Sequence, residues 1–177
     1  MPSTTNTPEA SIHPAALPLN DLVAQCSIQF MRRSGPGGQH RNKVSTAVLV
    51  RHRATGTHAE ANERRSQAEN RAVALFRLRV NLALEVRSLR KTGSVPSDLW
   101  RSRSSHGRIE INPRHDDFPS LLAEALDVMT ACDDEPRLAG ETLGCSATQL
   151  VRLLKKEPRA LAQVNQRRLR RGLHGLR

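Results

Sequence analysis

The segment between Arg33 and Lys43 restricts the folds open to this chain more than any other part of the sequence. It reads Arg-Ser-Gly-Pro-Gly-Gly-Gln-His-Arg-Asn-Lys, so every position from 35 to 38 is glycine or proline. Glycine permits backbone conformations that other residues avoid, and proline removes a hydrogen-bond donor. We therefore expect a tip between regular elements, and the basic residues on both sides of it should attract a polyanion.

The residues on either side of the tip are typical of strands. Residues 26–33 alternate apolar and polar side chains, and residues 44–52 are apolar and rich in β-branched types. A short connection that ends at Gly56 suits a hairpin turn, and residues 57–61 are then the return strand. The pattern predicts a small antiparallel sheet with the tip between its first two strands.

A long helix is expected to follow this sheet. Ser66-Gln67-Ala68-Glu69 is a capping box, in which the serine and glutamate serve otherwise unpaired amide donors at the start of a helix. Apolar residues then recur at steps of three and four, and Thr92-Gly93 is a plausible stop. The fold class predicted for residues 19–92 is therefore α+β, a small antiparallel sheet packed by one long helix.

The rest of the chain divides by composition. Residues 1–18 are rich in Pro, Ser, Thr and Ala and are expected to be disordered, and residues 93–117 are interpreted as a linker. Residues 118–177 are predicted to form a small all-helical unit whose last helix begins at Pro158 and runs to the end. Within it, Gly140, Gly144 and the N-cap candidate Ser146 have helix-turn-helix-like spacing, although plain three-helix packing gives the same pattern.

Charge points to a nucleic-acid partner. The 177 residues carry a formal net charge of +11 and a pI near 11.2. Aromatic residues make up only 2% of the chain, which disfavours base stacking and favours contacts from Arg and Lys to phosphate. An acidic stretch at 116–141 between basic stretches suggests surfaces with different partners.

The three cysteines indicate a reducing compartment. Cys26, Cys132 and Cys145 are widely spaced and have no close histidine partner, which fits neither a disulfide framework nor a zinc site. The sequence also contains no apolar run long enough to span a membrane and no secretory or transit signal. We expect a cytoplasmic protein, without a membrane partner, that acts as a monomer.

Further residues in the same order complete a family pattern. Gly37-Gly38-Gln39 is followed by Asn42-Lys43, then by Thr55-Gly56, and finally by Arg65-Ser66-Gln67 with Asn70. Residues 26–90 thereby resemble the GGQ domain of class I peptide chain release factors and of their short, codon-independent ribosome-rescue relatives. The resemblance implies that the tip enters the ribosomal peptidyl-transferase centre and promotes hydrolysis of the peptidyl-tRNA ester.

The resemblance also implies roles for the tip residues. Gly37, Gly38 and Gln39 are the catalytic candidates: the glycines keep the tip thin, the Gln39 backbone amide stabilises the transition state or leaving group, and its side chain positions the water. Similar factors are often methylated on this glutamine, which makes a glutamine methyltransferase a candidate partner. No metal and no organic cofactor is implied.

Polar and basic residues around the tip are RNA-binding candidates. For His40, RNA contact or structural support is favoured over a general base. Arg65 and Gln67 can equally be read as parts of a helix start, and the tip cations as a solvated loop. The candidates are Arg33, Ser34, His40, Arg41, Asn42, Lys43, Arg65 and Gln67, with Arg152, Lys155, Lys156, Arg167, Arg168, Arg170 and Arg171 as a second, C-terminal set.

The expected function is ribosome-dependent release without stop-codon recognition. Codon-reading release factors carry large regions ahead of the GGQ domain, whereas only about 25 residues precede it here. We therefore expect rescue of stalled ribosomes, with large-subunit rRNA and P-site peptidyl-tRNA as partners. The alternative is a non-catalytic ribosome-binding or RNA-binding protein, or a helix-turn-helix regulator, although only Thr148, Gln149 and Arg152 could read DNA from the second helix.

Overall fold

A three-stranded antiparallel sheet forms one end of the molecule. The computed structural model describes residues 12–31, 46–90 and 95–177. Strands β1 (Cys26–Met31), β2 (Ala47–His52) and β3 (His58–Ala61) lie in that order in the sheet, and Gly56 turns the chain between β2 and β3 with a φ of +75°. The three predicted strands are confirmed where the structure describes them.

Helix α2 (Gln67–Glu85) covers one face of the sheet, as the capping box predicts. The Ser66 hydroxyl accepts a hydrogen bond from the Glu69 amide at 3.4 Å, and Leu78 is fully buried in the same core as Val50 of β2. The helix ends at Glu85 and not near residue 92: Val86 has the extended angles φ −93° and ψ 139°, and Leu89 is exposed. The chain turns away here because the amides of Ser88 and Ser97 donate to Asp127 and Glu124 of α4.

Regular structure precedes the sheet in residues 12–24, which corrects the expected disorder for residues 12–18. It forms the 3-10 turn η1 (Pro14–Ala16) and helix α1 (Leu19–Ala24). Ala15 is fully buried, and its carbonyl accepts hydrogen bonds from Arg79 Nε of α2 and from the Ser120 hydroxyl of α4. Tertiary contacts with both helices therefore hold a segment whose composition alone suggests disorder.

The expected linker also carries regular structure. It contains α3 (Asp98–Arg103) and a two-stranded hairpin, β4 (Ser104–Ser105) with β5 (Arg108–Ile109). Trp100 is fully buried and donates from its indole Nε1 to the Leu143 carbonyl at 2.9 Å, and Ile109 and Ile111 are buried too. Three large apolar side chains provide enough buried surface to order a stretch that is otherwise polar.

Four helices form the remaining unit: α4 (Phe118–Ala131), α5 (Pro136–Leu143), α6 (Ala147–Lys155) and α7 (Pro158–Arg170). Helices α5 and α6 make the expected helix-turn-helix. Gly144 turns the chain at φ +66°, Ser146 caps α6, and a Cβ added at Gly140 would lie 2.7 Å from the Cys145 carbonyl oxygen. The last helix ends at Arg170, short of the predicted residue 177, and Gly172 follows at φ +73°.

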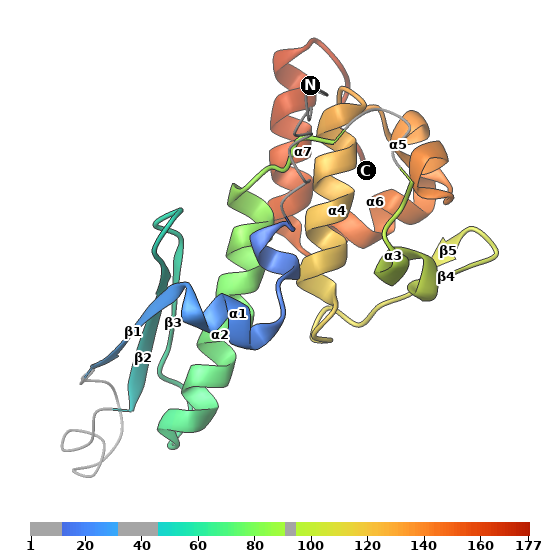
Figure 1. Cartoon of the computed structure of the whole chain (residues 1–177). Coiled ribbons are helices and arrows are strands. Elements are labelled where there is room, and N and C mark those ends of the chain that lie inside the picture. Colours follow the sequence, from blue (N-terminus) through green and yellow to red (C-terminus); the bar gives the residue numbers. More distant parts are fainter. Residues whose placement is uncertain (1–11, 32–45, 91–94) are drawn as a thin grey trace, which may run out of the picture.

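The two parts share a single core. Figure 1 shows α4 beside the C-terminal half of α2, while the sheet packs along the other side of α2. Buried residues of the sheet, of α2 and of α4 to α7 belong to one continuous apolar cluster. None of the helices in the described residues is long and apolar enough to cross a membrane.

Candidate functional site

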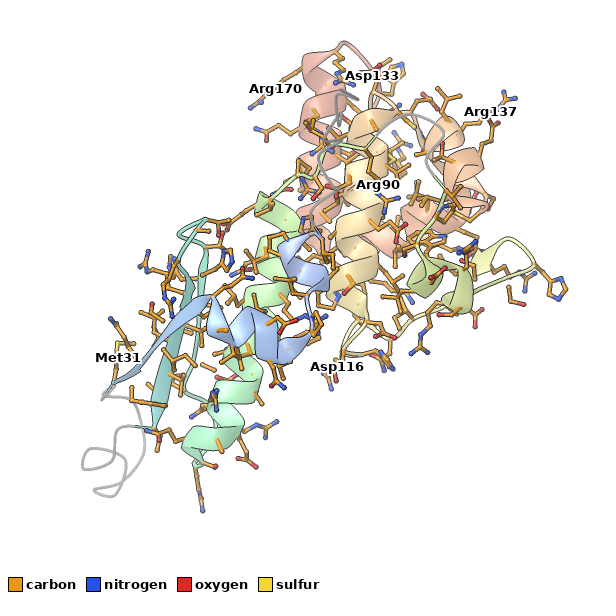
Figure 2. All side chains as sticks on the ribbon, viewed as in Figure 1. Met31, Arg90, Asp116, Asp133, Arg137 and Arg170 are labelled. Carbon is orange, nitrogen blue, oxygen red and sulfur yellow. The ribbon has the colours of Figure 1, made fainter. Side chains whose placement is uncertain are left out.

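The glycine-rich segment is attached at the free end of the sheet. Met31 and Ala47 are directly paired across β1 and β2, so the chain leaves and returns at neighbouring positions, roughly 5 Å apart for paired residues in an antiparallel ladder. Met31 is labelled in Figure 2 at the end of the sheet that points away from the helical unit. The tip candidates themselves lie outside the described residues, namely Arg33, Ser34, Gly37, Gly38, Gln39, His40, Arg41, Asn42 and Lys43.

Asn70 holds the position where the chain returns from this segment. Its side chain is fully buried, and Nδ2 donates to the Thr46 carbonyl at 2.7 Å and to the Arg64 carbonyl at 2.9 Å. Its Oδ1 accepts from the Arg64 backbone amide at 2.9 Å. We call the ends of the two strands that flank the glycine-rich segment, at Met31 and Thr46, the loop root. One amide side chain thus joins the loop root to the residues just before α2. The sequence pattern did not assign this positioning role to Asn70.

The first turn of α2 lies at the same end of the molecule as the loop root (Figure 1). Arg65 and Gln67 are both exposed there, which leaves the predicted RNA contacts from these two residues as a proposal. Arg64, which precedes α2, and Arg71, one turn into it, are also exposed, and the sequence reasoning did not include them. Asn70 therefore connects the loop root to a set of exposed cations.

Of the C-terminal candidates, the three on α6 and directly after it are all accessible. Arg152, Lys155 and Lys156 are exposed, and the Lys156 ammonium donates to the Ile111 carbonyl beside β5. These side chains lie on a helix that packs beside the hairpin β4–β5, away from the sheet (Figure 1).

Most candidates at the end of α7 form internal contacts. Arg167 pairs with the fully buried Asp134 at 2.6 Å, and Arg171 pairs with Asp133 at 3.2 Å. Arg168 is only 8% exposed and donates to the carbonyls of Asp134 and His174 at 2.5 and 2.8 Å. These contacts give Arg168 a role in the fold, and its RNA contact stays a prediction.

The acidic stretch accordingly serves the fold in part. Asp133 and Asp134 both have positive φ, 54° and 59°, at the turn after α4, and the α7 arginines neutralise their charge. Arg170 points outward at the far end of α7 (Figure 2), and it makes no ion pair with the described residues. Met31 at the end of the sheet and Arg170 at the end of α7 lie at opposite ends of the molecule (Figure 2).

The described residues contain no group of three His, Cys, Asp or Glu side chains placed to hold a metal ion. His52, the buried histidine of β2, already has Thr55 Oγ1 and Gln25 Oε1 within 3.0 Å of its two ring nitrogens, and burial lowers its pKa. The described part of the domain therefore supplies position and positive charge near the loop root.

These features define the chain as a small α+β domain that presents a basic, glycine-rich segment from the end of a three-stranded sheet, followed by a helical unit on the same core. The RF-1 domain family model matches residues 21–115, more than half of the chain. The protein belongs to the RF-1 domain family.

Several curated proteins share this region. A 76-residue stretch is 41% identical to the chloroplastic peptide chain release factor PrfB1 of Arabidopsis thaliana and covers 43% of this chain and 16% of that protein. Peptide chain release factor 1 of Xylella fastidiosa is 36% identical over 94 residues, which are 51% of this chain and 26% of that protein. For peptide chain release factor 1 of Acidiphilium cryptum the identity is 41% over 70 residues, 40% of this chain and 20% of that protein. The chain thus spans about a sixth to a quarter of the length of these relatives.

Proposed function

We propose that this protein promotes hydrolysis of the peptidyl-tRNA ester on the ribosome. The observation that carries the proposal is the family match over residues 21–115, which includes Gly37-Gly38-Gln39 between two paired strands. The relatives named above are peptide chain release factors. The proposed partners are the large-subunit rRNA and the P-site peptidyl-tRNA.

In this proposal the chain contributes geometry and hydrogen bonds, and the ribosome supplies the surrounding cavity. Ester hydrolysis needs a water aligned with the carbonyl carbon and donors for the negative charge that develops on oxygen. Gly37 and Gly38 supply a backbone without side-chain bulk, the Gln39 amide donates to the transition state or leaving group, and the Gln39 side chain orients the water. The water oxygen bonds to the carbonyl carbon as the bond to the tRNA ribose oxygen breaks, and the tRNA leaves with a free hydroxyl.

The experiment is peptide release from purified ribosomes stalled on truncated mRNA. Wild type should release peptide. Gly38→Ala adds bulk to the tip and Gln39→Ala removes the side chain that orients the water, so each should lower the rate by roughly 100-fold, the scale of a misplaced reacting group. Two matched controls lie elsewhere: Gly175→Ala, where an added Cβ makes ordinary contact with Asn165 at 3.5 Å, and Gln29→Ala on the exposed part of β1. Both controls should keep wild-type release.

Ribosome pelleting separates chemistry from binding. Tip variants that still pellet with ribosomes but release no peptide would place the chemistry at the tip. Wild type that pellets and releases nothing would overturn the hydrolase proposal in favour of a non-catalytic ribosome-binding protein.

Codon independence is the second half of the proposal. It predicts that release is as fast with a sense codon or an empty A site as with a stop codon. A requirement for a stop codon would contradict it.

A glutamine methyltransferase acting on Gln39 is proposed as a further partner, and a mass increase of one methyl group on the tip peptide would support it.

A further inference from the structure

A basic groove runs between helix α6 and the hairpin β4–β5. It consists of two adjoining clefts of about 420 and 630 Å³, both lined by Arg108 of β5 and Gln149 of α6. The smaller cleft extends to the turn of the helix-turn-helix at Gly144, and the larger extends along α6 to Lys156. We call these two clefts together the hairpin groove.

One face of α6 forms the first wall. Gln149, Arg152, Leu153 and Lys156 follow one another at steps of three, one and three residues, so they share one side of the helix and all line the larger cleft. The second wall is β5 and the extended residues after it, from Glu110 to Asn112. The Lys156 ammonium donates to the Ile111 carbonyl and so bridges the two walls.

The groove contains cations without internal partners. Arg108 and Arg152 are exposed, and neither guanidinium forms a hydrogen bond or ion pair with any residue that the structure describes. Two carboxylates also line the groove. Glu141 is paired with Arg137 at 3.2 Å, which leaves Glu110 as the carboxylate that opposes an anionic ligand.

We propose that the hairpin groove binds single-stranded RNA through its phosphates. Two unpaired guanidinium groups match phosphate oxygens in geometry and charge, and the amides of Gln149 and Asn112 can donate to phosphate or sugar oxygens. The lining contains no Phe, Tyr or Trp, and His106 at the rim of the smaller cleft is its one ring, so the contact is made mainly to the backbone of the RNA. The hairpin lies along the polar face of α6, which is the face that a helix-turn-helix would have to present to a DNA major groove.

The groove lies far from the loop root. In Figure 1 the hairpin β4–β5 and the ends of β1 and β2 are on opposite sides of the molecule. An RNA strand in the groove would anchor the helical unit independently of the glycine-rich segment. This inference adds a second contact to the proposed function and rests on it for the choice of RNA over other polyanions.

The test measures binding of a fluorescein-labelled ten-nucleotide oligouridine to the full chain by anisotropy over a salt series. Arg108→Ala and Arg152→Ala should each weaken binding about fivefold to tenfold at low salt and lower the slope of log K against log salt by about 0.7, the value for one lost phosphate contact on a single strand. Glu110→Gln should tighten binding. The matched control Arg101→Ala removes an exposed arginine that pairs with Asp98 outside the groove, and it should bind like wild type.

Three outcomes would overturn the proposal. Groove variants that bind like the Arg101→Ala control would show that the RNA contact lies elsewhere. Absence of oligouridine binding by wild type at low salt would rule the site out. A glutamate peptide of equal charge that competes as well as the RNA, with the same dependence on Arg108 and Arg152, would make the groove an acidic-peptide site.

Peptide release measured on the same variants separates this proposal from the proposed function. Tip variants should lose release and keep the groove-dependent part of RNA binding. If groove variants bind normally while wild type releases peptide, only the groove proposal fails. If wild type releases no peptide while the groove variants lose RNA affinity, only the hydrolase proposal fails.

Discussion

Asn70 shows how a single side chain can position a loop from outside it. An amide carries both donors and an acceptor, and Asn70 uses both kinds, two bonds from Nδ2 to backbone carbonyls and one at Oδ1 from a backbone amide. No other side chain of that size supplies donors and an acceptor in this arrangement. Because Thr46 is the last residue before β2, the position of the returning chain depends on this one buried group.

Asn70→Asp is therefore expected to be costly. The carboxylate is nearly the same size, but it cannot donate to the Thr46 and Arg64 carbonyls and brings a charge into a fully buried position. We expect the free energy of unfolding to fall by about 2 to 4 kcal/mol. Urea unfolding at neutral pH measures this.

A matched substitution tests whether burial is the cause. Asn81 is partly exposed, donates to the His58 carbonyl at 2.9 Å and accepts from Arg159 at 2.9 Å, so an aspartate there could still pair with the arginine. Asn81→Asp should cost less than about 1 kcal/mol. Equal losses at the two positions would contradict the special role of Asn70. At a temperature where Asn70→Asp stays folded, its peptide release should also be slower than that of Asn81→Asp, since only Asn70 contacts the loop root.

At the scale of elements, local signals could be predicted from the sequence and distant partners could not. The capping box and the strand alternation depend on neighbouring residues, and α2 and the sheet form where these patterns predict them. The end of α2 depends on α4, about 40 residues further along the chain. There Asp127 accepts from the Ser88 amide at 3.1 Å and Glu124 accepts from the Ser97 amide at 2.8 Å, so both residues are held against α4.

In the candidate site, too, the features set by neighbouring residues could be predicted from the sequence and those set by distant residues could not. The glycine-rich segment could be found from its own residues and their order, because the family pattern is local. The role of Asn70, the internal ion pairs of Arg167 and Arg168, and the hairpin groove could not, because each depends on residues brought together by packing. A basic run in the sequence does not reveal which of its cations are neutralised inside the fold.

The contact between the α2–α3 connection and α4 is expected to depend on pH. Burial raises the pKa of Asp127 from 3.8 to about 6, despite the nearby Arg87 and the hydrogen bond from Ser88. The folded protein therefore holds this proton more tightly than the unfolded chain does. The resulting stabilisation is complete below about pH 4 and is lost as the pH rises through about 6.

Asp127→Asn isolates this effect, since the new amide oxygen can still accept from Ser88 and carries no charge. Relative to wild type, the variant should gain about 2 to 3 kcal/mol of unfolding free energy between pH 4 and pH 7.5, the equivalent of a shift of about two pKa units. Urea unfolding of both proteins at several pH values gives the difference. A difference that does not change with pH would show that Asp127 has the same pKa in the folded and unfolded states.

At the scale of the whole molecule, the sheet and the helical unit are joined by more than one connection. Helix α4 packs on α2, and the Ala15 carbonyl receives hydrogen bonds from both helices, through Arg79 and Ser120. A single apolar cluster runs from Val50 in β2 to Leu153 in α6. The loop root and the hairpin groove thus sit at the two ends of one continuous core, and their separation is set by this packing.

A continuous core predicts that the whole chain unfolds in one cooperative transition. Trp100 is the only tryptophan, is fully buried in the helical unit, and reports on that unit by its fluorescence. Val50→Ala removes two methyl groups from the sheet and should lower the unfolding free energy by about 2 kcal/mol. If the core is one unit, the fluorescence midpoint in urea should fall by the amount that this whole loss of unfolding free energy requires, although the substitution is at the other end of the molecule.

Val95→Ala, at an exposed valine near Trp100 in sequence, should leave the midpoint unchanged. A Trp100 transition that ignores Val50→Ala would mean that the sheet unfolds on its own, and the distance between loop root and groove would then no longer be fixed by the fold.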